Sequence, residues 1–398
     1  MNIQFSPPDI SELEIEQVTE VMRSGWITTG PKTKLFEKKI AEYCGTNKAA
    51  CLNSATACLE MTLRILGIGK GDEVITSTYT YTASASVIDH VGAKIVFADV
   101  AKDSFHIDYD SLPDLINERT KAIIPVDIGG VMCDYDKIFA ALELKKHLFR
   151  SGHNKYLKNF DRPVVIADAA HSFGALYKGK KSGTAADFTC FSFHAVKNLT
   201  TAEGGAATWL DRDGIDNDEL YKEYMHLSLH GQSKDAFSKT APGSWEYDIL
   251  TTGYKCNMTD ILAGFGLAQL ERFDTLKQKR ISIVKRYDEA LLPLGIKRLN
   301  HVSKDCEGNG HLYLMRIDGI DEAERNRIIA ALSEEGIACN VHFKPLPMHT
   351  AYKNLGFDIK DYPNAYAQYE NEISLPLHTL LTDEQVEYVC EKVKEIIK

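Results

Sequence analysis

Strand-like and helix-like segments alternate through roughly the first two-thirds of the chain. Apolar, β-forming runs are followed by segments with helical periodicity, such as Ala55–Leu66 and Thr82–Val91. This alternation predicts an α/β fold in which a mainly parallel sheet carries helices on both faces. In such sheets ligands bind beyond the carboxyl ends of the strands, so residues just after a strand are the first functional candidates. The predicted strands are Lys48–Asn53, Glu73–Ser77, Lys94–Ala98, Lys121–Val126, Val164–Ala167, Phe188–Phe193 and Ala206–Leu210.

The last third of the chain has a different pattern. An apolar-periodic helix begins at Thr259–Asp260 and runs towards Leu291. Because 398 residues are too many for one simple core, we expect a large domain, residues 1–258, followed by this bridging helix and a small α+β domain within 259–398. The elements expected there are a strand at His311–Ile317, a helix near Glu322–Glu335, a strand at Ile337–Phe343 and a last helix opened by a capping box of Thr382 and Gln385.

The stretch between Ile138 and Pro163 is longer than a helical crossover needs. Its middle, KKHLFRSGHNKYLKNFD, is basic and aromatic. We interpret residues 139–162 as a surface insertion, and a flap over the functional site is the alternative.

Composition excludes several classes of protein. A net charge of −10 and a pI near 5.7, with no basic run, argue against a nucleic-acid surface. The nine cysteines are scattered and form no CxxC pair, which favours reduced thiols over a disulfide framework or a zinc site, and no metal is expected. The N-terminal segment is acidic and no apolar stretch is long enough to span a membrane, so we expect a cytoplasmic protein.

Asp168 is the first candidate functional residue, at the end of the apolar run VVIAD. A buried carboxylate is costly unless a positive group meets it. The pyridine nitrogen of pyridoxal phosphate is such a group, because an aspartate keeps it protonated and lets the ring accept electrons. An ordinary aspartate that caps the following turn is the simpler alternative for this residue alone.

Lys197 follows a later strand, within the loop FSFHAVKNLTTAEGG. A lysine that forms a Schiff base must lose its proton readily, which partial desolvation or nearby cations promote. His194 and Ser192 lie just upstream. Most loop lysines are merely solvated, but a polar lysine loop one strand after Asp168 favours a cofactor site.

Two further segments could complete such a site. In LNSATACLEM a strand passes directly into a helix whose first turn holds Ser54, Ala55 and Thr56, and its free N–H groups could bind phosphate. A plain serine N-cap is the alternative. Tyr79 and Tyr81 follow another strand, where an aromatic ring could stack on the cofactor or simply pack. Neither a P-loop nor a G-x-G-x-x-G fingerprint is present in these segments.

Several long motifs resemble the DegT/DnrJ/EryC1/StrS family of sugar aminotransferases. The resemblance runs from about Phe5 to the C-terminus, apart from the insertion. It implies a fold type I enzyme of pyridoxal phosphate, with a mainly parallel seven-stranded sheet in the large domain. The motifs that carry it are SGWITTGPK, GIGKGDEVIT, TKAIIPV, FSFHAVKNLTTAEGG and GYKCN.

The resemblance also implies roles for individual residues. Lys197 would hold the cofactor and transfer protons, and Asp168 would pair with the pyridine nitrogen. His171 would lie near the phenolic oxygen, where many relatives have glutamine. Tyr81 would stack on the ring. The phosphate would be bound by Ala55, Thr56 and Ser192.

Family members are at least dimers, so the resemblance implies a homodimer whose active site is shared across the interface. A loop from the neighbouring subunit would reach the phosphate through Gly253–Asn257, with the choice between Lys255 and Asn257 left open. The substrate contacts implied by position are Trp26, Thr28, His194 and His342.

The implied reaction is a ping-pong transamination. L-glutamate would give its amino group to the cofactor and leave as 2-oxoglutarate, and a nucleotide-linked keto-sugar, first of all a UDP-4-keto-sugar, would accept it. A cyclitol ketone is an alternative acceptor. A deoxysugar dehydratase is a second alternative, although in those relatives histidine replaces the lysine that is present here as Lys197. A non-catalytic regulator is a third.

Three departures from the family pattern leave the sugar open. Asp127 stands in DIGG where relatives have histidine, Cys256 replaces a common tyrosine, and residues 139–162 are unusual.

Overall fold

The computed structural model describes residues 1–233 and 246–397. Its centre is a seven-stranded sheet with the strand order β1-β9-β8-β5-β4-β2-β3. Only β9 runs antiparallel to its neighbours, so the predicted mainly parallel α/β sheet is confirmed. The strands are β1 (Ala49–Leu52), β2 (Glu73–Ser77), β3 (Lys94–Ala98), β4 (Thr120–Ile124), β5 (Val164–Asp168), β8 (Phe188–Ser192) and β9 (Gly205–Trp209).

Helices cover both faces of this sheet, because alternate strand residues point to opposite sides. Ile123 and Val165 face one core with helices α2, α6 and α8, whereas Ala122 and Ile166 face a second core with α3, α4 and α7. Burial on both faces explains why these strands are almost continuously apolar. The helices are α2 (Pro31–Cys44), α3 (Ala55–Ile65), α4 (Ala83–His90), α6 (Tyr135–Lys145), α7 (Asn217–Ser228) and α8 (Asp260–Leu291).

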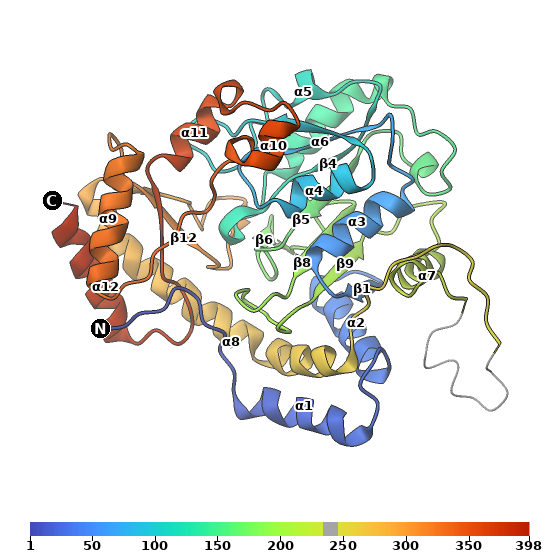
Figure 1. Cartoon of the computed structure of the whole chain (residues 1–398), viewed down its shortest axis with the longest axis horizontal. Helices are drawn as coiled ribbons and strands as arrows, with labels where there is room; N and C mark the ends of the chain where they lie inside the picture. Colours follow the sequence, from blue (N-terminus) through green and yellow to red (C-terminus); the bar gives the residue numbers. More distant parts are fainter. Residues whose placement is uncertain (234–245, 398) are drawn as a thin grey trace.

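Helix α8 runs from beneath the large sheet to a second, three-stranded sheet ordered β10-β12-β13 (Figure 1). Thr259 caps it, and its buried Tyr287 packs into a third core with helices α9 and α12. The predicted capping box of Thr382 and Gln385 opens α12. These elements are β10 (Lys297–Arg298), β12 (Tyr313–Arg316), β13 (Glu372–Leu375), α9 (Glu322–Glu334) and α12 (Asp383–Ile396).

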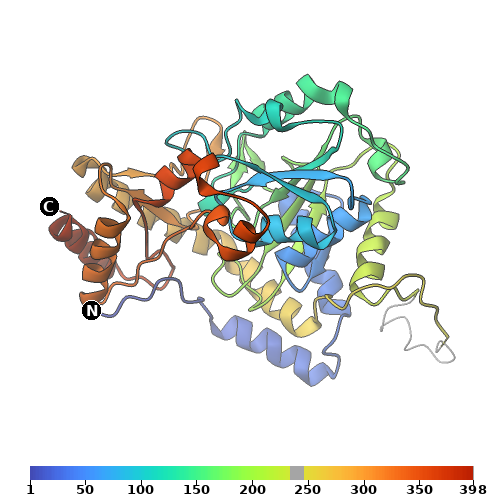
Figure 2. The same ribbon diagram turned by 45° about the horizontal axis from the view of Figure 1, so that its top comes forward.

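The C-terminal third also reaches back over the large sheet. Helix α10 lies beside α4 in both ribbon views (Figures 1 and 2). In α11 the backbone N–H of Ala365 donates to Asp99, the residue just after β3 (2.8 Å). The Tyr352 and Phe357 rings pack edge-on against Phe97, and the Tyr352 hydroxyl bonds Thr82. The remaining elements are α1 (Glu12–Ser24), α5 (Leu112–Leu115), α10 (Thr350–Asn354), α11 (Pro363–Tyr369), a small sheet of β6 (Leu176–Tyr177), β7 (Lys180–Lys181) and β11 (Cys306–Glu307), and 3-10 turns at Ile128–Gly130, Lys146–Leu148, Leu157–Asn159, Leu292–Leu294, Leu346–Met348 and Ile359–Asp361.

The strand predicted at Ile337–Phe343 is wrong. This segment makes only two isolated bridges, Ile3 to Ile337 and Asn340 to Ser374. The strand that pairs with β12 is β13, which was not predicted, and the segment meets this sheet only where Asn340 bridges Ser374 of β13. After Asn340 the segment turns into the cavity described below.

Residues 139–162 are only partly on the surface. Helix α6 takes up their first third, and the side chains of Tyr156, Leu157 and Phe160 are buried in the core beneath α3 and α7. The amide of Asn154 donates to the carbonyl of Ile65 (3.0 Å). None of these residues lines the cavity described below, so within the described chain the flap alternative has no support. In the two described stretches of chain, no helix is both long and apolar enough to cross a membrane.

Candidate active site

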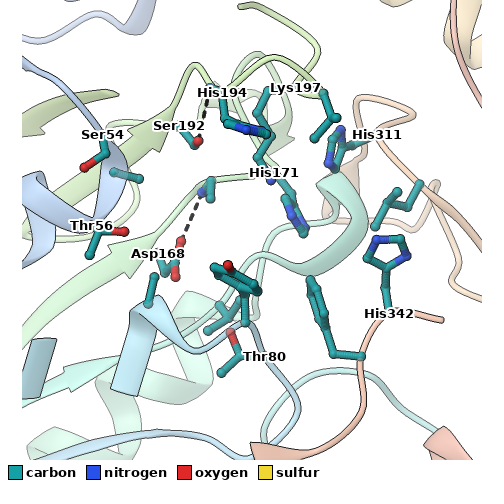
Figure 3. A pocket seen from close by; sticks show the side chains of 18 of the residues that line it. Ser54, Thr56, Thr80, Asp168, His171, Ser192, His194, Lys197, His311 and His342 are labelled. Carbon is teal, nitrogen blue, oxygen red and sulfur yellow. Dashed lines mark hydrogen bonds between the residues drawn. The ribbon is translucent and has the colours of Figure 1, made fainter. Parts of the chain in front are cut away.

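A cavity of about 480 Å³ lies beyond the carboxyl ends of β5 and β8, beside the start of α3. This is the edge of the sheet at which the strand pattern predicts ligand binding. Most of the predicted site residues line it, including Asp168 and Lys197 (Figure 3). Its far wall comes from the second part of the chain, through His311, His342 and Phe343.

Asp168 is the last residue of β5 and is buried. Its Oδ2 accepts a hydrogen bond from the Ser84 hydroxyl (2.6 Å), and its Oδ1 accepts one from the backbone N–H of Ala170 (3.1 Å). Burial raises the pKa of Asp168, while these donors and the charge of Lys197 act in the opposite direction. Each carboxylate oxygen keeps a lone pair, so the group can receive a protonated ring nitrogen from the cavity.

Lys197 lies in a tight turn, where its backbone N–H donates to the carbonyl of His194 (2.9 Å). Burial lowers the pKa of Lys197 to about 8, against the opposing charge of Asp168. About a tenth of this amine is therefore uncharged at pH 7, far more than for a surface lysine, and only the uncharged form attacks an aldehyde. The two residues on which the prediction depends face the same cavity.

The start of α3 has the geometry expected of the predicted phosphate cradle. Ser54 caps the helix, its hydroxyl accepting from the N–H of Ala57 (3.0 Å), and Ala55 and Thr56 line the cavity. Gly205 of β9 lies against this turn so closely that a Cβ there would be 2.5 Å from the Ala55 nitrogen. Together with the helix dipole, the N–H groups of Ala55 and Thr56 in this first turn suit a phosphate. The predicted phosphate contact Ser192 lines the same end.

His171 is held in one protonation state. The N–H of Gly129 donates to its Nδ1 (3.1 Å), and burial places its pKa well below the usual value. The neutral ring therefore carries its proton on Nε2 and can donate towards a phenolic oxygen. Asp127 is buried nearby and accepts from the N–H of Cys133 (2.9 Å) and the Ser172 hydroxyl (2.7 Å). It fastens the Gly129 loop to the segment that carries His171.

The remaining predicted residues of the cavity lie around its mouth. Tyr81 is 63% exposed, with its ring centroid 6.1 Å from that of Phe343. The Nε2 of His194 lies 3.6 Å from the carboxylate of Glu203. The ring of His342 stacks on Phe5 at 5.4 Å, and burial lowers its pKa to about 4. Aromatic side chains from three separate segments, Phe5, Tyr81 and Phe343, are thus part of the lining.

Four predicted residues lie outside this cavity. The indole of Trp26 donates to the carbonyl of Thr29 (3.2 Å), which belongs to the same loop as Thr28. The ammonium of Lys255 donates to Asn257, whose amide donates to the Thr29 hydroxyl (2.6 Å). The two segments therefore meet each other rather than the cavity of their own chain, and their predicted contacts remain predictions.

The polar residues that were not predicted from the sequence include His311 in the cavity wall, and Ser84 and Asn198, which bond Asp168 and His311. Ser84 follows Thr80 by one helical turn, and their hydroxyls are 2.8 Å apart, so spacing in STYTYTAS was a usable signal. Asn198 adjoins Lys197 in the sequence. His311 lies far along the chain, and nothing in its own segment points to the cavity.

Pyridoxal phosphate needs an amine that binds its aldehyde, an acid opposite its ring nitrogen, and donors around its phosphate. The residues at the ends of β1, β5 and β8 fit those needs, and the surrounding sheet is the one on which such enzymes are built. Fold and cavity together define a pyridoxal-phosphate-dependent aminotransferase.

The chain belongs to the DegT/DnrJ/EryC1/StrS aminotransferase family, whose model matches residues 8–394. It is 38% identical to the spore coat polysaccharide biosynthesis protein SpsC of Bacillus subtilis, over all of this chain and 97% of that one. It is 37% identical to the UDP-4-amino-4-deoxy-L-arabinose–oxoglutarate aminotransferase of Shewanella sediminis, over 100% and 99% of the two chains.

Solved structures agree in fold. Spr1654 of Streptococcus pneumoniae, described as a candidate sugar aminotransferase, is 54% identical in its pyridoxal-phosphate form, with a TM-score of 0.96 over 100% of this chain and 98% of that one. Its pyridoxamine-phosphate form gives a TM-score of 0.97 at 55% identity over 99% of each chain. The expected family, fold and cofactor are thereby confirmed.

Proposed function

We propose that this enzyme transfers the amino group of L-glutamate to a nucleotide-linked keto-sugar, with a UDP-4-keto-sugar as the first candidate. The geometry that carries the proposal is the placement of Lys197 and Asp168 in one cavity at the edge of the sheet. The acceptor and donor are suggested by the Shewanella relative, whose name specifies a UDP-4-amino-sugar and oxoglutarate. SpsC supports a role in polysaccharide synthesis.

Bound pyridoxal phosphate supplies an electron sink for the carbon that loses or gains a proton. Lys197 can move that proton, because its pKa near 8 allows it to act as both base and acid. With the cofactor bound, Asp168 would keep the ring nitrogen protonated from inside the cavity. His171 would donate from Nε2 to the phenolic oxygen and orient the ring.

The lining suits a hydroxyl-rich acceptor better than a dicarboxylate. Among the described lining residues Lys197 is the only lysine, and there is no arginine. Burial keeps the pKa values of His171, His311 and His342 low, so these rings are neutral. Cationic groups that bind the carboxylates of the amino donor would then come from outside this lining, which supports the proposed homodimer.

The proposed dimer would place Gly253–Asn257 of a second copy against the phosphate end. Exposed apolar side chains near the opening and this segment support such an interface. They are Val196, Ile249, Leu250 and Tyr254. We also propose a cytoplasmic enzyme, because the nine cysteines are all free thiols.

A substrate panel tests the proposal. Purified enzyme with pyridoxal phosphate and L-glutamate would be offered UDP-, dTDP- and GDP-linked 4-keto-sugars, and 2-oxoglutarate would be measured. We expect turnover with the UDP-sugar and none with Lys197→Ala, which should keep its fold by circular dichroism. Turnover with an inosose and with no nucleotide sugar would overturn the assigned acceptor, and multiple turnovers by Lys197→Ala would overturn the role of the lysine.

A further inference from the structure

His311 lies in the cavity wall close to Lys197 and His171, just before β12 (Figure 3). Its ring centroid is 4.3 Å from that of His171, and the two planes are tilted by 40°. The side chain is buried from bulk solvent but lines the cavity. It therefore faces any molecule that approaches the lysine.

One nitrogen of His311 is committed to the protein. Its Nδ1 is 2.9 Å from Oδ1 of Asn198, whose own amide nitrogen donates to the carbonyl of Asn309 (3.1 Å). That second bond fixes the orientation of the Asn198 amide, so Oδ1 can only accept. Nδ1 of His311 must be the donor.

The protonation state of Nε2 follows from that of Nδ1. Burial, together with the nearby cationic groups, lowers the pKa of His311 well below its usual value, so the ring holds a single proton. With that proton on Nδ1, Nε2 presents a lone pair. In the part of the chain that the structure describes, no protein donor meets Nε2.

His171 has the opposite arrangement, since its Nδ1 accepts from Gly129 and its Nε2 carries the proton. Two adjacent rings thus present one donor and one acceptor. A lone pair in the wall repels a carboxylate and accepts from a hydroxyl.

We propose that His311 is a specificity-determining residue whose Nε2 accepts a hydrogen bond from a hydroxyl of the amino acceptor, next to the reacting carbonyl. Asn198 is the positioning residue that keeps this nitrogen unprotonated. The inference rests on the proposed function, because it assigns the hydroxyl-bearing substrate to the second half-reaction. L-glutamate has no such hydroxyl.

Two substitutions separate the role of Nδ1, which bonds Asn198, from the proposed role of Nε2, which would bond the substrate. His311→Asn can keep the bond to Asn198 but has no group at the Nε2 position, whereas His311→Gln places an amide oxygen there. Removing one partner of a buried hydrogen bond leaves the hydroxyl unpaired, so we expect His311→Asn to slow the sugar half-reaction about ten- to hundredfold more than the glutamate half-reaction. His311→Gln should restore most of that difference.

Both half-reactions are measured by rapid mixing, following the absorbance of the bound cofactor, with the UDP-4-keto-sugar that the wild-type enzyme accepts best. His301 provides a matched control, because it is a buried histidine outside the cavity, bonded through Nε2 to the carbonyl of Leu312 (2.9 Å). His301→Asn should leave the ratio of the two rates unchanged. An equal loss in both half-reactions for His311→Asn would overturn the proposal.

The protonation of the ring is tested separately, by ¹⁵N NMR of histidine-labelled enzyme. We expect His311 protonated at Nδ1 and His171 protonated at Nε2, with His311→Asn identifying the signal. Asn198→Ala should give a mixture of the Nδ1-protonated and Nε2-protonated forms of His311. A proton on Nε2 of wild-type His311 would overturn the inference, whereas a wild-type enzyme that accepts no sugar nucleotide would overturn the proposed function and leave the NMR result standing.

Discussion

At the scale of single residues, the chemistry depends on how far each charge has been removed from water. Lys197 and Asp168 both lie in the cavity, and burial opposes the charged form of each. Their mutual attraction offsets part of that cost. Lys197 is therefore deprotonated more readily than a surface lysine, while Asp168 still meets a positive neighbour.

Covalent attachment of the cofactor should report the pKa of Lys197 directly. Because only the free amine attacks an aldehyde, the rate at which pyridoxal phosphate attaches to cofactor-free enzyme should rise with pH and level off above about 8. Stopped-flow absorbance measures this rate. Asp168→Asn removes a charge that raises the pKa of the lysine, so the midpoint should move to lower pH. A midpoint close to 10.5 would contradict the desolvated amine.

Ser84 should control the affinity for the cofactor through Asp168. Ser84→Ala removes the donor on Oδ2, which raises the proton affinity of the carboxylate and weakens its pairing with the ring nitrogen. Hydrogen bonds to charged groups are strong, so we expect about ten- to hundredfold weaker binding of pyridoxal phosphate by equilibrium dialysis. Ser86→Ala, on the same helix, is the control. Equal affinities for both variants would remove Ser84 from the site.

The site residues that lie at or shortly after the ends of strands were predictable from the sequence. Asp168 was predictable because an apolar strand that ends in a charged group is unusual, and Lys197 because it lies in a polar loop that follows the next strand of the sheet. Ser54 could be found because a strand passed straight into a helix. Asn198 and His311 could not, since their roles depend on a contact between distant segments that no local pattern encodes.

At the scale of elements, a buried carboxylate joins helices α2 and α7 to β1 at the edge of the sheet. Glu37 of α2 accepts from the N–H of Cys51 in β1 (2.9 Å) and from the hydroxyl of Tyr221 in α7 (2.7 Å). Burial raises the pKa of Glu37 from 4.5 to about 7. Three elements around the phosphate cradle thus share one titrating group.

This group should make stability depend on pH. Between about 4.5 and 7 the folded chain keeps the proton of Glu37 and the unfolded chain loses it, so the free energy of unfolding should fall as pH rises. Glu37→Gln does not titrate and can keep both contacts, because its Oε1 can accept from the N–H of Cys51 and its Nε2 can donate to the Tyr221 oxygen. It should remove up to about 3 kcal/mol of that fall.

Urea unfolding at several pH values measures the effect. Glu42→Gln, on the exposed side of the same helix, is the control and should follow the wild type. A pH profile of Glu37→Gln that is parallel to the wild type would show that Glu37 does not titrate in this range.

Helices and strands were predictable from the sequence where a single pattern of apolar residues dominated the segment. The strands of the large sheet are buried on both faces and read as continuous apolar runs. The segment Ile337–Phe343 is equally apolar in part, yet β13 occupies the position beside β12. Which of two short apolar segments pairs is settled by packing between the helices around them, not by their own composition.

At the scale of the whole molecule, the site has contributions from both ends of the chain and, by our proposal, from a second copy. Hybrid dimers test the second copy. Lys197→Ala would be mixed with a chain carrying Lys255→Ala and Asn257→Ala, and subunits would be exchanged by mild unfolding and refolding. A hybrid contains one intact site, so random mixing should restore about a quarter of wild-type activity.

Each variant refolded alone is the control and should stay inactive or nearly so. If mixing restores nothing while gel filtration shows dimers, then the segment Gly253–Asn257 serves the cavity of its own chain.

The position of β1 at the edge of the sheet bears on how the protein is made. Ala49 pairs with Thr208 of β9, and β1 has no other neighbour in the large sheet. Although β1 is the first strand to leave the ribosome, it can pair with the sheet only after β9 has been made. The turn into α3 depends on that docking, through Gly205. A nascent chain halted before β9 should thus already hold Asp168 and Lys197 yet be unable to retain the cofactor.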